Sequence, residues 1–284
     1  MTPRNALLAI HLGALLFGLS GIFGKLADTS AEMITAGRSL FAVIALLIFA
    51  KLVSKVRLVN LGLRQTAALA LGGALLGGHW WAFFEAVRIS GVAIATLGFA
   101  SFPAFTVVLE SLLLRERASR IEYAMIALVC LGLVLVTPHF DLSSQATAGL
   151  LWAVFSGLLF ALLSVLNRVS TQGIEPAQAA LYQNITVLLL YLPFAWPTLP
   201  HTQAHNWLWM VMLGVLCTGL AHTLFVASLK VLKARTTAVI FALEPVYGIA
   251  FAWVLFNEQP TLRMLAGGLL IVSAIFISAR LVKH

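Results

Sequence analysis

Residues 99–117 read FASFPAFTVVLESLLLRER, and residues 241–259 read FALEPVYGIAFAWVLFNEQ. In each stretch a proline precedes an apolar run that ends at a glutamate, Glu116 in the first and Glu258 in the second, 142 residues later. The same offset joins Phe99 to Phe241, Pro103 to Pro245, Phe83 to Phe225, Gly77 to Gly219 and Leu128 to Leu270. The chain therefore repeats one unit, which predicts two related halves over residues 1–142 and 143–284.

The composition indicates that this chain is folded in lipid. Hydrophobic residues make up 61% of it, charged residues only 10%, and the mean hydropathy is +1.00, whereas a soluble domain carries about 25% charged residues. We predict an all-α integral membrane protein with ten transmembrane helices, because most of its apolar spans reach the roughly 20 residues that cross a bilayer. The spans cover residues 5–27, 32–52, 65–87, 92–114, 121–138, 147–168, 177–196, 207–228, 235–256 and 262–281.

The distribution of basic residues predicts the orientation. Five spans per half is an odd number, so the two halves should enter the membrane in opposite senses. Of the 18 lysines and arginines, only Lys25, Arg38, Arg88 and Arg263 fall on the side opposite the N-terminus, which leaves fourteen on the N-terminal side. The positive-inside rule then places both termini in the cytoplasm. Because these charges are divided among short loops, they do not indicate a nucleic-acid partner.

The sequence carries no motif for catalysis or for a cofactor. It contains no HExxH, CxxC, GxSxG or phosphate-binding GxxxxGK[ST] pattern. Its two cysteines, Cys130 and Cys217, fall inside apolar spans and predict neither a disulfide nor a metal site. We therefore expect a protein that is not an enzyme and that holds no metal ion or cofactor.

The candidate binding residues are those whose chemistry is unusual at the depth where it occurs. Pro103 and Pro245 fall near the middle of their spans, where proline frees a backbone carbonyl, and two such breaks in matching positions predict a midplane site; simple kinks are the alternative. An ionisable group in a span also needs a partner. Glu244 could bind an ammonium group or only pack, and Arg38 could bind a carboxylate or extend to the interface.

Histidines and aromatic residues gather at the same predicted depth. His79 and His222 could bind a carboxylate or a proton, or could simply donate a hydrogen bond between helices. Aromatic rings could accept an apolar side chain or a cation, although most of them would contact lipid or other helices. The candidates of this kind are Trp80, Phe83, Phe99, Phe102, Tyr182 and Phe241.

The repeated segments from Pro103 to Glu116 and from Pro245 to Glu258 resemble those of the drug/metabolite transporter superfamily, and specifically of its EamA-type members. Phe17 to Lys25, Arg38, and Glu244 with Pro245 extend the resemblance over nearly the whole chain. Within the superfamily the chain is most similar to the YddG-type amino-acid exporters of bacterial inner membranes. This resemblance implies two inverted five-helix halves around a central substrate cavity.

We therefore expect a multi-pass transporter of the bacterial inner membrane that exports small organic solutes, aromatic or large neutral amino acids among them, by alternating access. A carrier of cationic drugs or of nucleotide-linked sugars is an alternative within the superfamily, and an integral membrane enzyme or receptor is one outside it. The exact substrate, the coupling ion, the direction of net transport and the oligomeric state stay open, and a monomer is compatible with the sequence.

Overall fold

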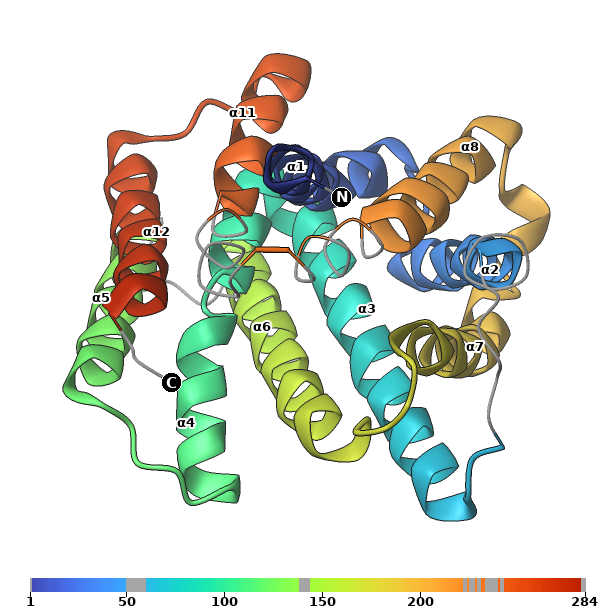
Figure 1. Cartoon of the computed structure of the whole chain (residues 1–284). Coiled ribbons are helices and arrows are strands. Elements are labelled where there is room, and N and C mark those ends of the chain that lie inside the picture. Colours follow the sequence, from blue (N-terminus) through green and yellow to red (C-terminus); the bar gives the residue numbers. More distant parts are fainter. Residues whose placement is uncertain are drawn as a thin grey trace.

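Every regular element in the described part of the chain is helical (Figure 1). The structure is a computed structural model that describes residues 2–49, 60–137, 144–221, 224, 228, 231, 232, 240 and 243–281. The α-helices are α1 (Pro3–Leu26), α2 (Ala31–Phe49), α3 (Leu63–Phe99), α4 (Phe102–Leu113), α5 (Arg120–Val136), α6 (Gln145–Ser170), α7 (Pro176–Ala195), α8 (Ala204–Met212), α11 (Glu244–Phe256) and α12 (Leu262–Leu281). A short 3₁₀ helix, η2 (Leu199–His201), precedes α8, and a π-helical segment, η3 (Leu213–Leu220), follows it.

Several helices start where a local capping signal satisfies their free N–H groups. At α1 the Thr2 hydroxyl accepts from the Asn5 N–H at 3.3 Å, and Pro3 occupies the first turn, where its missing N–H has no partner to lose. At α5 the Ser119 hydroxyl accepts from the Glu122 N–H at 3.3 Å, while the Glu122 carboxylate accepts from the Ser119 N–H at 2.6 Å. This reciprocal capping box starts the helix at the point where the sequence predicts the fifth span.

The third and fourth predicted spans are divided differently in the structure. The sequence separates them between residues 87 and 92, but α3 runs through this region as one element of 37 residues with a kink at Gly91. Gly91 has φ 81° and ψ 172°, a backbone conformation that is accessible to glycine and strained for other residues. The loop expected there is therefore a kink, and the chain breaks later, at residues 100 and 101.

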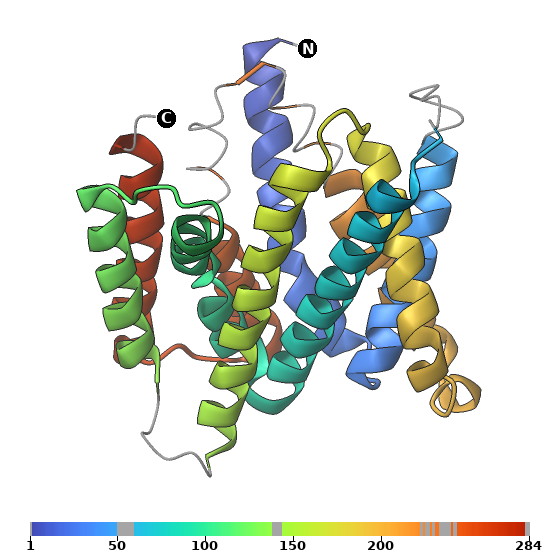
Figure 2. The same cartoon turned by 90° about the horizontal axis from the view of Figure 1, so that it is seen from below.

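Helices from distant parts of the sequence pack in pairs (Figures 1 and 2). The most extensive contacts join α3 to α6, α5 to α12, α2 to α7, and α3 to α7, and the main partner of α1 is α11. Small residues allow this close approach. At the α5–α12 crossing, a Cβ atom on Gly132 would lie 2.8 Å from the carbonyl oxygen of Gly267.

The outer surface of the bundle is suited to lipid. The helices α1, α2, α3 and α6 are each long and apolar enough to cross a membrane, and large apolar side chains are exposed on many helices, such as Leu8, Leu112, Leu189, Val254 and Leu269. Water would leave this much exposed apolar surface unfavourably hydrated. The fold is therefore that of a multi-pass membrane protein, as the sequence predicts.

The start of α1 and the end of α12 lie at the same end of the bundle (Figure 2). We call this the terminal end, and we call the opposite one, where α1 ends and α2 begins, the far end. The last turn of α6 and the first turn of α7 also lie at the terminal end (Figure 2).

Candidate functional site

Two helices begin at the repeated proline–glutamate segments, and both begin in the interior of the bundle. The α4 helix starts at Phe102 after a break at Ala100 and Ser101, so Pro103 lies in its first turn. The α11 helix starts at Glu244, so Pro245 lies in its first turn. The expectation that both prolines occupy the middle of a helix is therefore wrong. At the first break α3 ends at Phe99 before α4 starts, and each proline occupies the first turn of its helix, which removes the clash that an interior proline would cause.

An aromatic cluster fills the bundle beside the first break. The His79 ring lies 4.9 Å from the Phe99 ring and 6.5 Å from the Phe83 ring, measured between centroids. The Phe99 ring stacks on Phe102 at 5.2 Å, and Phe160 of α6 contacts this group at 4.9 Å from His79. Four of the aromatic and histidine candidates are thus neighbours in space, and the structure adds Phe160 to them.

His79 is held by α6. Its side chain is buried, with 7% exposed, and its Nδ1 lies 2.7 Å from the Ser156 hydroxyl. The Ser156 hydroxyl also donates to the His79 carbonyl oxygen at 3.0 Å. This pair of contacts joins α3 to α6, one helix from each half of the chain. His79 therefore makes the interhelical hydrogen bond that the sequence offers as one of its two roles.

Arg38 is buried instead of extending to the interface. Only 3% of it is exposed, and its guanidinium carbon lies 4.0 Å above the centre of the Trp80 ring. Its Nε donates to the Thr218 hydroxyl at 2.9 Å, in η3. No direct ion pair joins Arg38 to Glu244 among the described contacts. A buried arginine stacked on an indole is a strong attractive arrangement, because neither group is well solvated.

The remaining candidates lie outside the aromatic cluster or outside the described part of the chain. Pro245 is buried at the start of α11, where a Cβ atom on Gly18 of α1 would lie 2.9 Å from the Glu244 carbonyl oxygen. Tyr182 packs near the start of α3 with Leu69, away from the aromatic cluster. His222 and Phe241 fall outside the described residues, so their roles stay predictions.

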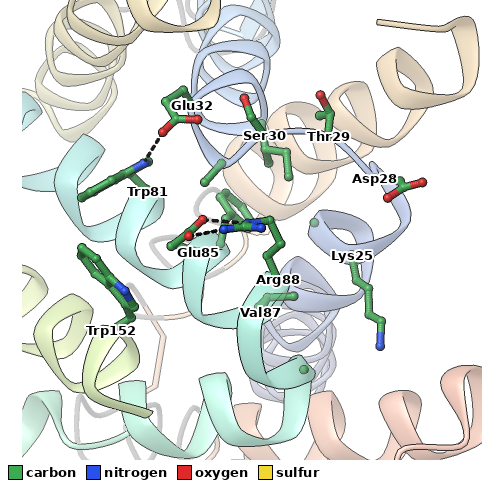
Figure 3. A pocket seen from close by; sticks show the side chains of 15 residues that line it. Lys25, Asp28, Thr29, Ser30, Glu32, Trp81, Glu85, Val87, Arg88 and Trp152 are labelled. Atoms are coloured by element: carbon green, nitrogen blue, oxygen red, sulfur yellow. Dashed lines mark hydrogen bonds and ion pairs between the residues drawn. The ribbon is translucent and has the colours of Figure 1, made fainter. Parts of the chain in front are cut away.

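A cavity of about 730 Å³ opens at the far end of the bundle (Figure 3). Its wall includes Trp81, whose indole N–H donates to the Glu32 carboxylate at 2.8 Å. Glu85 and Arg88 form a two-point ion pair on the next turn of α3, with the Arg88 Nε 2.9 Å from Glu85. Other residues of the lining are Lys25, Asp28, Thr29, Ser30, Phe84, Val87, Gly91 and Trp152.

This cavity is not centred on the two helix breaks, which differs from the midplane site that the sequence predicts. Phe102, Pro103 and Glu244 do not line it, because aromatic rings fill the space beside the first break. The two regions are nevertheless neighbours. Phe84 lines the cavity, and its ring centre lies 5.9 Å from the guanidinium carbon of Arg38.

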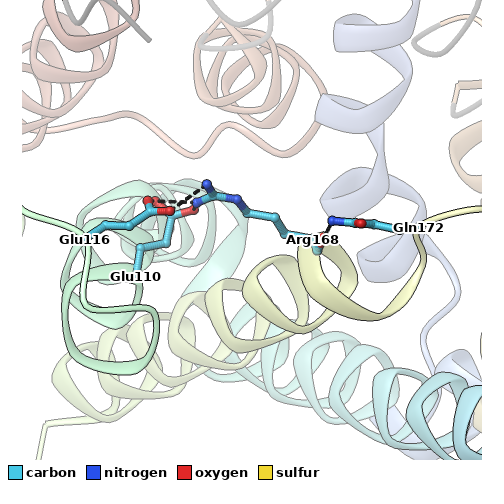
Figure 4. Close-up of polar contacts among 4 residues, drawn as sticks. All are labelled: Glu110, Glu116, Arg168 and Gln172. Carbon is cyan, nitrogen blue, oxygen red and sulfur yellow. Dashed lines mark hydrogen bonds and ion pairs between the residues drawn. The ribbon is translucent and has the colours of Figure 1, made fainter.

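The repeated glutamates form ion pairs at opposite ends of the bundle. At the terminal end Arg168, in the last turn of α6, binds Glu110 at 2.6 Å and Glu116 at 2.7 and 3.0 Å (Figure 4). At the far end Lys25, in the last turn of α1, pairs with Glu258. Each pair connects the first helix of one half with the segment that follows the proline helix of the other half.

Comparisons with known proteins decide the family. The model of the EamA-like transporter family matches residues 4–137 and again residues 147–280. The chain belongs to the EamA-like transporter family. As the sequence predicts, it is a transporter rather than an enzyme, and such a family implies a small-molecule substrate and a membrane location.

Relatives of this EamA-like transporter carry transporter names. It is 27% identical over 276 residues to an uncharacterized transporter of Archaeoglobus fulgidus, covering 96% of this chain and 95% of the relative. It is 26% identical over 225 residues to the pseudopaline exporter CntI of Pseudomonas aeruginosa, covering 78% of each chain. A solved crystal structure has the same fold, with a TM-score of 0.65 and 18% identity over 98% of this chain and 97% of the other.

The sequence of this EamA-like transporter predicts neither the cavity nor its carboxylates. Glu32 and Glu85 are not among the candidate residues, although both lie within apolar spans. A carboxylate that close to the hydrocarbon needs a partner. The partners are Trp81 for Glu32 and Arg88 for Glu85, and this rule could have selected both glutamates in advance.

Proposed function

We propose that this EamA-like transporter exports small organic solutes, aromatic and large neutral amino acids among them, by alternating access. The observation that carries the proposal is the buried Arg38 stacked on Trp80, next to the aromatic cluster of His79, Phe83 and Phe99. The guanidinium group suits a carboxylate and the rings suit an apolar side chain. In this structure the rings fill the space at the breaks, so in the proposed cycle the cargo site opens when the halves move apart.

We further propose that the halves 1–142 and 143–284 are inverted repeats. At the 142-residue offset α1 matches α6, the α4 segment matches α11, and α3 matches the segment of α8 and η3. The contacts follow the same exchange, because α1 packs on α11 and η3, while α6 packs on α4 and α3. The ion pairs of Glu116 and Glu258 at opposite ends of the bundle support this relation.

The proposed orientation places the terminal end in the cytoplasm of a bacterial cell, at its inner membrane. The described residues at that end include Arg115, Arg117, Arg120 and Arg168. The far end includes Lys25 and Arg88. This bias follows the positive-inside rule. Export is the proposed direction, and the name of the Pseudomonas aeruginosa relative, an exporter, supports it.

Counterflow of labelled solutes in proteoliposomes tests the cargo. We expect phenylalanine and methionine to be carried faster than glutamate, because burial of an apolar side chain contributes roughly 25 cal/mol per Å². Trp80→Ala or Phe83→Ala should weaken apparent affinity for phenylalanine more than for alanine. Phe194→Ala, which truncates a ring on the exposed surface of α7, is the matched control and should change neither affinity.

Two outcomes would contradict the cargo assignment while leaving the family intact. One is glutamate carried as fast as phenylalanine, and the other is no exchange of any amino acid. Exchange of a quaternary ammonium drug or of a nucleotide-linked sugar by the same liposomes would then favour those cargo classes.

A further inference from the structure

The far-end cavity carries more negative than positive charge once its ion pairs are taken into account. Three carboxylates line it, those of Asp28, Glu32 and Glu85, against two cations, Lys25 and Arg88. Glu85 is neutralised by Arg88. Lys25 is neutralised by Glu258, and its side chain points away from Glu32 (Figure 3).

Asp28 and Glu32 are the two carboxylates of the lining that no ion pair among the described residues neutralises. The charge of Arg88 also attracts Glu32 from a greater distance, but Arg88 is already bound by Glu85. A carboxylate in a cavity attracts a counter-ion more strongly than one in open water, because the surrounding protein lowers the local dielectric. The charge of the cavity therefore favours a cationic group on its occupant.

The Glu32 carboxylate is held by one of two indole rings that pack together in the cavity wall. The Trp81 indole N–H donates to one of its oxygens at 2.8 Å, and the second oxygen has no donor among the described residues. The Trp152 ring meets the Trp81 ring edge to face, at 5.0 Å between centroids and an interplanar angle of 78°. Trp81 comes from α3 and Trp152 from α6, so both halves of the chain contribute to this wall.

A carboxylate next to indole rings is an arrangement that binds ammonium groups, because the ring faces and the carboxylate both attract the cation while the rings cover its apolar part. We propose that the far-end cavity is a second binding site, distinct from the Arg38–Trp80 region, that takes the ammonium group of an organic molecule against Glu32, Trp81 and Trp152. This inference rests on the proposed function only in that the occupant is cargo on its way out. The same chemistry admits an amino acid or an organic amine.

The test measures binding, not transport, with the full-length protein in lipid nanodiscs. Three probes of one shape separate the charges: phenethylamine has the ammonium group alone, phenylalanine has both charges, and hydrocinnamate has the carboxylate alone. Calorimetric titration of the unaltered protein and of Glu32→Gln separates this site from the Arg38–Trp80 region, where a carboxylate can also bind. The binding lost in Glu32→Gln should be strongest for phenethylamine, weaker for phenylalanine, and absent for hydrocinnamate. If phenylalanine binds tighter than phenethylamine at this site, the occupant's carboxylate is also recognised and the assignment to the ammonium group alone is wrong.

Glu32→Gln is the decisive variant, because a glutamine oxygen can still accept from Trp81 while the charge is lost. We expect about tenfold weaker binding of phenethylamine, the size of one desolvated cation contact. Glu175→Gln, an exposed carboxylate at the start of α7, is the matched control and should bind as the unaltered protein does. Trp152→Leu should also weaken binding, and it tests the ring independently of the charge.

Unchanged phenethylamine affinity in both Glu32→Gln and Trp152→Leu would overturn the proposal, as would hydrocinnamate binding that depends on Glu32. These results are separate from the cargo test. Glu32-dependent binding of phenethylamine without counterflow of any amino acid would remove the proposed function and leave this site standing. If phenylalanine shows counterflow and Glu32→Gln changes neither that counterflow nor the binding of phenethylamine, the proposed function stands and this second site is removed.

Discussion

Replacement of Gly91 by alanine tests the connection between the kink of α3 and the far-end ion pair. A Cβ atom at Gly91 would lie 2.9 Å from the carboxylate oxygen Oε2 of Glu258, and the residue has φ 81°. The same oxygen accepts from the Ala93 N–H at 3.2 Å, where the helix resumes after the kink. Gly91→Ala should therefore strain the backbone and also displace the carboxylate from Lys25 and Ala93.

Gly173 separates these two effects. It has φ 77°, but a Cβ atom there would meet nothing within 4 Å, so Gly173→Ala introduces strain without a clash. Backbone strain costs about 1–3 kcal/mol, and the φ 81° and ψ 172° of Gly91 place it at the upper end of this range. At Gly91 the lost hydrogen bond to a carboxylate adds about 1.5–3 kcal/mol. The Lys25 pair adds only about 0.2–1 kcal/mol, because 37% of that side chain is exposed.

We expect Gly91→Ala to lower the free energy of unfolding by about 2–4 kcal/mol more than Gly173→Ala does. Unfolding of the purified protein by SDS in mixed micelles, followed by far-UV circular dichroism, measures both. In a Glu258→Ala background the excess should fall by about 1.5–3 kcal/mol, because the carboxylate is no longer there to be displaced. An unchanged excess in that background, or equal losses for the two glycines, would refute the link to Glu258.

Three further predictions concern transport and topology. Glu244→Gln should slow counterflow more than Glu110→Gln, because Glu244 is placed at a helix break in the interior while Glu110 pairs at the terminal end; equal rates at equal expression would make Glu244 a packing residue. Arg38→Lys keeps the charge but loses the planar group that stacks on an indole, so counterflow should fall about tenfold, and an unchanged rate would argue against stacking. Single cysteines at the exposed positions Arg117 and Asn257 should react with a membrane-impermeant thiol reagent from the cytoplasm and from outside, respectively, and labelling from one side would contradict inverted halves.

The sequence predicts the class of this fold well, because apolar spans and their polar breaks are properties of short windows. It locates the interruptions at Pro103 and Pro245 but misplaces them within the helices. Whether a proline bends a helix or starts a new one depends on the backbone contacts of the preceding residues. At the first break the Ser101 hydroxyl satisfies the Gly98 carbonyl oxygen at 2.7 Å, which allows the helix to end there.

The candidate site is predicted only in part, because the sequence does not fix how each helix is rotated about its own axis. His79, Phe83, Phe99 and Phe102 meet because α3 and α4 are close in sequence and their shared depth decides the contact. The hydropathy pattern of α7 does not show which way Tyr182 faces, and in the structure it packs with Leu69 and Ile174 instead of with the aromatic cluster. The cavity needs α1, α2, α3 and α6 together, so no local pattern could reveal it.

The contact of α1 with α11 has a consequence for how the chain is made. Gly18 lies against residues 244 and 247, and Lys25 binds Glu258, so α1 meets its main partner only after more than 200 further residues have been synthesised. At about 5–20 residues per second, the ribosome needs on the order of 10–50 s to supply that stretch. During this interval the Gly18 surface of the first helix must be covered by lipid or by the insertion machinery. Although α1 is synthesised first, it can therefore complete its packing only after α11 has been inserted.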